Sequence, residues 1–306
     1  MTDTRTIDVC VASLGRPSLR VLMQALDRCE LPHDTTIRMI VADDSGKDKV
    51  RALRDGMDVS YPIEIVPAGS HNISTARNLT LDTATADLVA FVDDDEWPEP
   101  DWLMQLSGAM ERHGADAVIG SVRGLIPDQA PSWIKTARPF DRYYGANGTR
   151  MSTGVTSNAL VKRDAIEARS LRFDERYGTT GGEDTDFFAR LAGTGGIIVS
   201  SPEAVVSEHV PMDRLTDDHL RTRYMRGGYS HARATAPSLG TRSRAAFYAR
   251  GAVKYAVLTT MSAALRFVRP GEAKKMAVRA WAARGELLYG LGRPSPRPYG
   301  AKDRSA

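Results

Sequence analysis

Short apolar runs alternate with segments of helical spacing through the first hundred residues of the chain. The runs are rich in Val and Ile and have the length of buried strands. We predict strands over residues 7–13, 36–43, 63–67 and 88–93. Between them we predict helices over residues 18–28, 47–55 and 74–85. This alternation indicates an α/β fold whose central sheet is mostly parallel and flanked by helices.

The pattern continues less regularly as far as residue 211. We predict helices over residues 101–113 and 184–192, and strands over residues 117–123, 156–162 and 197–201. The connection that ends at Met151 is long, rich in Pro and aromatic residues, and expected to be irregular; such connections are usually functional. Helical spacing returns over residues 217–234, 242–268 and 272–291, and the Pro-rich end from Pro294 is expected to fray.

Charge is distributed unevenly along the chain, although the formal net charge of the 306 residues is only +3. Residues 1–211 hold 22 Lys and Arg against 32 Asp and Glu, a net charge of −10, whereas residues 212–306 hold 19 against 6, a net charge of +13. So basic a region favours an anionic partner, and both a nucleic acid and an anionic membrane surface are candidates. Its helices either lie in a membrane interface or pack on the rest of the chain with a cationic face toward solvent.

Several protein classes are excluded by composition. Cys10 and Cys29 are the only cysteines, too few for a disulfide framework or a Cys-rich zinc module, and this favours a reducing compartment. The first residues have neither the basic start nor the apolar core of a signal peptide. The most apolar helical segment, residues 255–265, is shorter than the about 20 residues that span a bilayer. We therefore expect a cytoplasmic protein without a transmembrane anchor.

Acidic side chains gather where the predicted parallel strands end, which is where open α/β sheets bind ligands. Asp93, Asp94 and Asp95 follow one strand directly, and Glu96 extends the run. Because four adjacent acids repel one another, a divalent cation is their natural partner. Alternation along an extended chain would place Asp93 and Asp95 on one side, where both reach the same ligand. Hard oxygen ligands suit Mg²⁺ or Mn²⁺ that bridges a diphosphate, although an acidic loop without a ligand is the alternative.

Two further positions lie at the same edge of the predicted sheet. Asp43 and Asp44 end the second strand; either their carboxylates bind a ligand, or Asp44 or Ser45 caps the next helix. Arg77 falls in the first turns of the next predicted helix, where its guanidinium either forms a helix salt bridge or meets a base, ribose or phosphate. Each of these residues is ambiguous on its own.

Taken together, five motifs in a fixed order carry a resemblance. They are Val11-Ala12-Ser13-Leu14-Gly15-Arg16-Pro17, Val41-Ala42-Asp43-Asp44-Ser45, Ala76-Arg77-Asn78, Val92-Asp93-Asp94-Asp95 and Gly182-Glu183-Asp184. In this order they resemble a family 2 glycosyltransferase of the GT-A fold over about residues 5–210. The resemblance is greatest to enzymes that build bacterial exopolysaccharide, including the succinoglycan type.

The resemblance implies a role for each motif. Asp43 or Asp44 would recognise the nucleobase, Asp93 would contact the ribose, and Asp95 would bind the metal. The same nucleotide-sugar site would include Ser13, Arg16, Arg77 and Asp94. His209, after the last predicted strand, would face the metal or the diphosphate as a further ligand beside Asp93 and Asp95.

The resemblance also implies the reaction. Asp184 would be the general base and Glu183 would orient the base or the acceptor, whose other contacts would include Trp133, Tyr143 and Asn158. An inverting transfer needs a base opposite the leaving diphosphate and a cation that neutralises the charge developing on it. We therefore expect a metal-dependent inverting hexosyltransferase with Mn²⁺ or Mg²⁺ as cofactor.

The expected donor is a nucleotide-diphosphate sugar, with UDP as the favoured carrier, and the expected acceptor is a glycan on a polyprenyl diphosphate. Residues 1–100 would form the donor half, residues 101–211 the acceptor and catalytic half, and residues 212–306 a basic helical extension. The extension would place the enzyme on the inner face of the cell membrane, and we expect no nucleic acid partner.

Other readings of the acidic motif fit less well. A phosphatase of the haloacid dehalogenase type has its Asp-x-Asp after the first strand, but the first strand here ends in Ser13-Leu14-Gly15-Arg16. A sugar-nucleotide pyrophosphorylase would need a Gly-rich basic loop near the start of the chain. A non-catalytic protein that binds glycan or nucleic acid through the basic region would not account for the acidic residues at the ends of the predicted strands.

Overall fold

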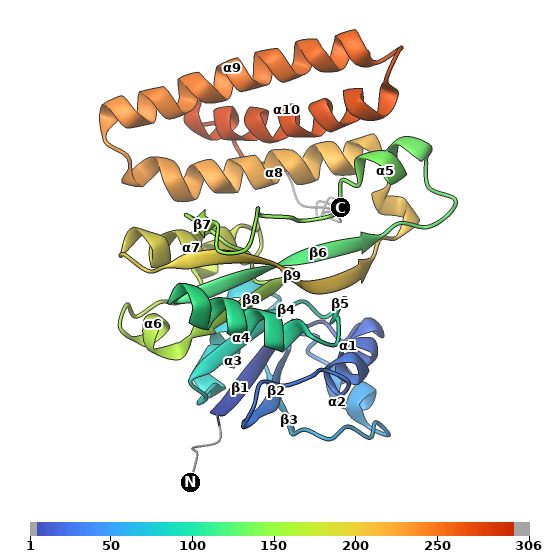
Figure 1. The fold of residues 1–306 in the computed structure, drawn as a ribbon, viewed down its shortest axis with the longest axis vertical. Helices are drawn as coiled ribbons and strands as arrows, with labels where there is room; N and C mark the ends of the chain where they lie inside the picture. Colours follow the sequence, from blue (N-terminus) through green and yellow to red (C-terminus); the bar gives the residue numbers. More distant parts are fainter. Residues whose placement is uncertain (1–4, 297–306) are drawn as a thin grey trace, which may run out of the picture. The chain divides into compact units, whose positions relative to one another are not determined.

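The computed structural model describes residues 5–296, which form two compact units (Figure 1). The sheet unit comprises the residues up to Arg123, Asp141–Thr179 and Phe187–His209. The helical unit comprises Gly124–Phe140, Thr180–Asp186 and the residues from Val210 onward. Each unit is described by itself below.

The strands of the sheet unit form one mixed sheet. Its order is β3 (Ile63–Pro67), β2 (Thr35–Asp43), β1 (Arg5–Ser13), β4 (Leu88–Val92), β8 (Asn158–Lys162), β6 (Ala117–Leu125), β9 (Ile198–His209) and β5 (Glu96–Pro98), and β7 (Arg150–Met151) pairs with β9. The strands from β3 to β4 are parallel, whereas β4 with β8, β8 with β6, and β9 with β5 and β7 are antiparallel. The first four strands of this order are therefore joined by parallel pairing.

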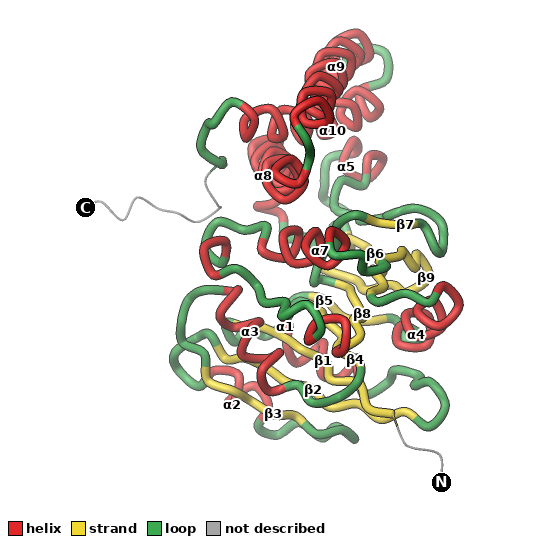
Figure 2. The backbone as a smooth tube through the Cα atoms, turned by 90° about the vertical axis from the view of Figure 1, so that its left-hand side faces the viewer, coloured by secondary structure: helices red, strands yellow, loops and turns green. Residues whose placement is uncertain are grey.

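Helices cover both faces of this sheet because its central strands are apolar on both sides (Figure 2). Ile7, Val9 and Val11 of β1 pack in one apolar cluster with α1 and α4, while Cys10 joins a second cluster on the opposite face with Leu81 of α3. The helices in chain order are α1 (Ser18–Leu26), α2 (Lys49–Arg54), α3 (Ile73–Thr83), α4 (Trp102–His113), α6 (Arg163–Glu167), the 3₁₀ turn η1 (Glu175–Tyr177) and α7 (Glu183–Gly193).

One charged side chain lies inside the sheet. Asp8 of β1 is fully buried and accepts two hydrogen bonds of 2.8 Å from Arg38 on β2. It also accepts hydrogen bonds from the backbone N–H groups of Thr85 (2.7 Å) and Ala86 (2.9 Å). Burial by itself raises the pKa of Asp8, but the bonds from Arg38 and the two backbone groups outweigh burial and hold the pKa below its usual value. Asp8 thereby ties β1 to β2 and to the turn before β4.

In the helical unit, α10 (Pro270–Gly290) packs between α8 (Asp217–Thr235) and α9 (Thr241–Leu265) (Figure 1). A Cβ atom on Gly228 of α8 would overlap the carbonyl of Ala282, and one on Gly285 would overlap the carbonyl of Met225, so glycine lets α8 and α10 approach backbone to backbone. Ile134, Phe140 and Leu220 belong to one apolar cluster, against which Trp281 of α10 packs. The remaining helical segments are α5 (Ser132–Ala137), η2 (Met212–Arg214) and η3 (Ala236–Ser238). Within residues 5–296, no helix has the length and apolar content needed to cross a bilayer.

The structure confirms the predicted elements with small shifts at their ends and departs from them in the antiparallel half of the sheet. The strand predicted over residues 197–201 is only the start of β9, which continues to His209. Its second half escaped notice because Pro202 and Glu203 interrupt the apolar pattern before buried Ala204 and Val206 resume it. β5, β7 and α6 were not predicted, and α5 lies in the connection expected to be irregular. Of the end expected to fray, residues 297–306 lie outside the described residues.

The Asp8–Arg38 pair yields a prediction about stability. Replacement of Asp8 by Asn leaves the guanidinium of Arg38 without its buried carboxylate and should lower the free energy of unfolding at pH 7 by about 3 kcal/mol. Because the pKa of Asp8 is lowered in the folded state, this stabilisation is complete above the unfolded pKa of about 4 and is lost as pH falls through the folded value. Urea denaturation at a series of pH values measures both effects.

The matched control removes an exposed carboxylate that also pairs with arginine. Asp82 bonds to Arg172 at 2.8 Å, but about half of each side chain is exposed. Asp82→Asn should therefore change stability little. Equal losses in the two variants would contradict a special role for Asp8.

Candidate active site

Three adjacent strands bring the predicted donor-site residues to one edge of the sheet. β1 lies between β2 and β4, so the segments that follow Ser13, Asp43 and Val92 emerge side by side. The backbone N–H of Asp44 donates to the carbonyl of Ser13 at 2.8 Å. The geometry expected for an open α/β sheet is thus present, with polar residues at the carboxyl ends of the parallel strands.

The centre of the site is the turn of acids after β4. Ser13 Oγ donates to Asp94 at 2.6 Å, and Arg16 donates to Asp94 at 3.1 Å and to Asp95 at 2.9 Å. Asp94 is buried, and burial raises its pKa to about 6 although Arg16 and Ser13 oppose the shift. The side chains of Asp93 and Asp95 are 35% and 29% exposed, which leaves their oxygens accessible to a ligand.

The chain turns directly after β4, and the acids lie in that turn. β4 ends at Val92, and the N–H of Glu96 donates to the carbonyl of Asp93 at 3.1 Å, which closes a turn. Asp94 and Asp95 consequently share Arg16, while Asp93 pairs with Arg77. Asp94 is buried whereas Asp93 and Asp95 are both partly exposed, so the expectation that the outer two acids share a ligand stays a prediction.

Arg77 lies where the sequence predicts it, in the second turn of α3. Asn72 caps this helix by accepting from the N–H groups of Ser74 (3.0 Å) and Thr75 (3.2 Å). The guanidinium of Arg77 is buried, donates to Asp93 at 3.0 Å and lies 5.8 Å from the centre of the Phe173 ring. Phe173 thus supports the flat guanidinium from the side of the core, so that Arg77 holds Asp93 from a fixed position.

Asp43 and Asp44 both shape loops at this edge. Asp43 accepts hydrogen bonds from the N–H groups of Ser45 (3.0 Å) and Val50 (3.1 Å). Of the two residues expected to cap the next helix, Ser45 Oγ accepts from the N–H of Lys49 at 3.4 Å, whereas Asp44 bonds elsewhere. Asp44 accepts from the N–H of Ser70 (2.6 Å), its hydroxyl (3.0 Å) and the N–H of His71 (2.8 Å). Both carboxylates are buried and order the loops that precede α2 and α3.

Glu96, which follows the acidic turn directly in the chain, forms a group with a second buried acid, Glu208, and the partly buried Arg142. Glu96 on β5 pairs in register with Glu208 on β9, and both are nearly inaccessible. Arg142 approaches Glu96 at 3.5 Å and Glu208 at 3.9 Å, and donates to the hydroxyl of Ser157 at 2.7 Å. Burial and the nearby Asp93 raise the pKa of Glu96 well above its usual value. Sequence reasoning missed Arg142 because it lies in the irregular connection, with no motif around it.

The donor set suits a metal that the substrate helps to bind. Within residues 5–296, no three His, Cys, Asp or Glu side chains are arranged as a closed metal site. Mg²⁺ is usually held by one or two carboxylates together with substrate phosphates, and the accessible Asp93 and Asp95 match that requirement. His209 is exposed one residue beyond Glu208, with its ring centre 4.7 Å from that of Trp97.

The Gly-Glu-Asp motif belongs to the helical unit, where the first turn of α7 carries Glu183, Asp184 and Asp186. The preceding Gly181 and Gly182 have φ values of +83° and +88°, a conformation that favours glycine. Two arginines of α8 hold this loop: Arg226 donates to the carbonyl of Thr180 (3.2 Å) and Arg233 to that of Gly181 (2.8 Å). These arginines were counted by sequence reasoning only as part of the basic region.

Around Asp184 itself, the carboxylate accepts from the N–H of Thr185 at 2.6 Å. Asp184 lies in the first turn of α7, where the helix dipole is complementary to a negative charge. Glu183 is buried beside it in the chain.

The three residues expected to contact the acceptor have different environments. Tyr143 is 66% exposed, and Trp133 lies in the helical unit with Lys274 Nζ 4.9 Å from the centre of its ring. Asn158 is fully buried: it accepts from Trp102 Nε1 and donates to the carbonyls of Ser121 and Ala204, all at 2.8 Å. Because its amide is engaged in the core, Asn158 is a structural residue and the acceptor role expected for it is corrected.

Comparison with known proteins identifies the family to which the chain belongs. The family model described as glycosyl transferase family 2 matches residues 11–169. The chain belongs to glycosyl transferase family 2. This glycosyltransferase is 35% identical over 303 residues to the succinoglycan biosynthesis protein ExoM of Rhizobium meliloti (strain 1021), with 98% of each chain covered.

Solved structures agree on the fold of this family 2 glycosyltransferase. The crystal structure of S. aureus TarS 1–349 in complex with UDP has a TM-score of 0.55 and 15% identity, and the complex with UDP-GlcNAc has the same TM-score and 14% identity. In both cases the similarity covers 94% of this chain and 92% of the other. The GT-A fold and the resemblance to exopolysaccharide glycosyltransferases are confirmed.

Arg142, which approaches both Glu96 and Glu208, gives a prediction about the stability of this glycosyltransferase. Arg142→Met removes the cation between Glu96 and Glu208 and should lower the free energy of unfolding by about 3 kcal/mol at pH 8. The loss should shrink toward pH 5, because the raised pKa of Glu96 lets that side chain become neutral. Adding Glu96→Gln should restore part of the stability, and chemical denaturation of the three proteins measures it.

Arg123 provides the control for that experiment. It pairs with Glu99 at 3.0 Å on the surface, and its side chain is 49% exposed. Arg123→Met should have little effect at either pH. Failure of Glu96→Gln to stabilise the Arg142→Met protein would show that Arg142 does not act by compensating the buried acid.

Proposed function

We propose that this chain is a metal-dependent, inverting hexosyltransferase that moves a sugar from a UDP-sugar to a glycan acceptor during synthesis of an exopolysaccharide or other surface glycan. The observation that carries the proposal is the acidic turn at Asp93–Asp95, held at the carboxyl edge of the sheet by Arg16 and Arg77. The function of ExoM in succinoglycan biosynthesis and the UDP ligands of TarS support the choice of pathway class and donor.

Donor binding follows from the charges at this edge. Asp93 is proposed to bind the ribose and Asp95 to hold Mn²⁺ or Mg²⁺, with His209 as a further contact of the metal or diphosphate. When bound, the metal neutralises the negative charge that develops on the leaving diphosphate. The half-exposed guanidinium of Arg16 can move from Asp95 to a phosphate, while Asp94, anchored by Ser13, keeps the turn in place. Asp43 or Asp44 recognises the base, and Arg77 fixes Asp93.

The catalytic base is proposed to be Asp184. Its carboxylate takes the proton of the acceptor hydroxyl as that oxygen attacks the anomeric carbon and the bond to the diphosphate breaks, which inverts the configuration. The loop bonds from Arg226 and Arg233 support this role, because they fix the start of the helix that carries Asp184. Glu183 orients the base or the acceptor.

The acceptor is proposed to be a glycan on a polyprenyl diphosphate, with Tyr143 and Trp133 among the residues that contact its sugars. Residues 1–100 would serve the donor, residues 101–211 the acceptor and the chemistry, and residues 212–306 would hold the enzyme at the cytoplasmic face of the membrane. No nucleic acid partner is proposed, because the acidic constellation requires a cation and a diphosphate rather than a phosphate backbone.

Metal-dependent donor binding tests the role of Asp95. Asp95→Ala should lose the component of UDP affinity that depends on Mn²⁺, since one carboxylate of the proposed metal site is gone. Isothermal titration calorimetry with UDP, with and without Mn²⁺, measures this component. The control variant Asp82→Ala removes an exposed carboxylate outside the site and should bind like the wild type. Unchanged metal-dependent affinity in Asp95→Ala would remove Asp95 from the metal site.

The base is tested by a nearly isosteric change. Asp184→Asn should keep UDP binding but lower turnover by about 10²–10⁴-fold, the usual contribution of a positioned base. Asp186→Asn removes the same charge from the same turn of α7 and should retain most of the activity. Equal losses in both variants would indicate that the charge of this helix end matters rather than a base at Asp184. A product with the donor's anomeric configuration would contradict inversion.

A further inference from the structure

One helix of the helical unit presents an apolar face that no other described segment covers. α9 packs against α10 through residues of intermediate or low exposure, among them Gly251, Tyr255, Leu258, Ser262 and Leu265. These residues are spaced three or four apart and therefore line one side of the helix. The opposite side of α9 is left to the surroundings.

That opposite side is apolar, although it is exposed. Val253, Val257 and Met261 are 64%, 50% and 43% exposed and recur every four residues, so they form one stripe. Phe267 and Val268, which follow the end of α9, are 81% and 78% exposed. We call these five residues the outer apolar face. A contiguous stripe of exposed apolar side chains marks a surface that binds a partner or lipid, and this side of α9 is not enclosed in a core.

The charged residues of α9 and of the segment directly after it are all positive. Residues 219–271 contain no Asp or Glu, and within or next to α9 lie Arg250, Lys254, Arg266 and Arg269. A second copy of this chain would bring the same cations to the same place and would be repelled. A nucleic acid would satisfy the cations but would leave the apolar side chains in water.

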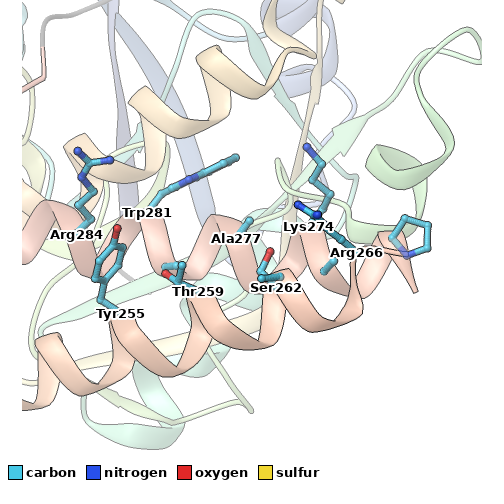
Figure 3. A pocket seen from close by; sticks show the side chains of 12 residues that line it. Tyr255, Thr259, Ser262, Arg266, Lys274, Ala277, Trp281 and Arg284 are labelled. Carbon is cyan, nitrogen blue, oxygen red and sulfur yellow. The ribbon is translucent and has the colours of Figure 1, made fainter. Parts of the chain in front are cut away.

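The groove between α9 and α10 has the same character (Figure 3). It has a volume of about 410 Å³, and its lining contains the cations Arg266, Lys274 and Arg284 but no acidic residue. Tyr255 and Trp281 contribute aromatic surface to it. Cations beside aromatic rings are what the headgroup region of an anionic bilayer would contact.

We propose that α9 lies in the headgroup region of an anionic membrane, with the outer apolar face directed toward the acyl chains. No helix of the described residues is able to cross the bilayer, which leaves a position in the interface. Basic side chains near such a surface are attracted to its negative potential. The inference deepens the proposed function and rests on it in one respect, the lipid-linked acceptor. Docking would raise the effective concentration of that acceptor at the active site.

The test is co-sedimentation of the full chain with vesicles of phosphatidylcholine, with and without phosphatidylglycerol. The wild type should bind the anionic vesicles, bind neutral vesicles far less, and be released as salt rises from ~0.05 to ~0.5 M because screening increases. The triple variant V253S/V257S/M261S should bind anionic vesicles about tenfold less or weaker still, because it presents no apolar stripe to the acyl chains.

A matched control replaces exposed apolar residues elsewhere. Val21 on α1 and Met104 on α4 are 42% and 43% exposed, similar to Met261, and V21S/M104S should bind vesicles like the wild type. A further variant, R250Q/K254Q, should weaken binding and reduce its salt dependence. Equal binding by the wild type and the triple variant, or no preference for anionic lipid, would overturn the proposal. So would lipid-free dimers of the wild type that the triple variant does not form.

UDP binding, measured by thermal shift on the same preparations, separates this inference from the proposed function. None of the residues changed in the vesicle experiment is a proposed donor-site residue, so every variant should keep the wild-type response to UDP and Mn²⁺. Vesicle binding without any response to UDP would contradict the proposed donor and leave the membrane face standing. A normal UDP response without vesicle binding would overturn only the membrane face.

Discussion

The crowding of carboxylates at one edge of the sheet is the constraint on which the rest of this glycosyltransferase depends. Asp93, Asp94, Asp95 and Glu96 follow one another, and Glu208 lies opposite Glu96 on the neighbouring strand. So many negative charges are tolerated because arginines from three other parts of the chain approach them: Arg16, Arg77 and Arg142. The arginines offset part of this negative charge, while the side chains of Asp93 and Asp95 remain partly exposed to solvent. These partly exposed carboxylates are where we propose that the metal and the diphosphate of the donor bind.

Two of these arginines are also held by residues outside the acidic turn. Arg77 rests against the ring of Phe173, and Arg142 is anchored by Ser157. The buried pair of Asp8 and Arg38 performs a related task inside the sheet, where it ties β1 and β2 together below the site. The sheet unit thus contains three such pairings, Asp8 with Arg38, Asp93 with Arg77 and Glu96 with Arg142, in each of which a guanidinium offsets the charge of a carboxylate.

The helical unit contributes in a different way. Glycines at its helix crossing let α8 and α10 approach closely, and arginines of α8 bond to the loop before α7. Part of the basic region therefore has a structural role, because Arg226 and Arg233 bond to the loop that precedes Glu183 and Asp184. The outer apolar face of α9 is a separate feature, whose residues take no part in those contacts.

The sequence by itself determined the alternating half of the fold and indicated the residues that we propose for the site. Local hydrophobic periodicity marks strands such as β3 and helices such as α3, and motif order pointed to Asp93, Asp95 and Asp184 before any coordinates were known. Only the tertiary structure showed that the chain turns after Val92, that Arg142 stands behind the acids, and that Asn158 belongs to the core. These facts depend on contacts between residues far apart in the chain, such as Arg142 with Glu96 and Asn158 with Trp102. Periodicity reports which face of a segment is buried, but it carries no information about the partner that each polar group will find.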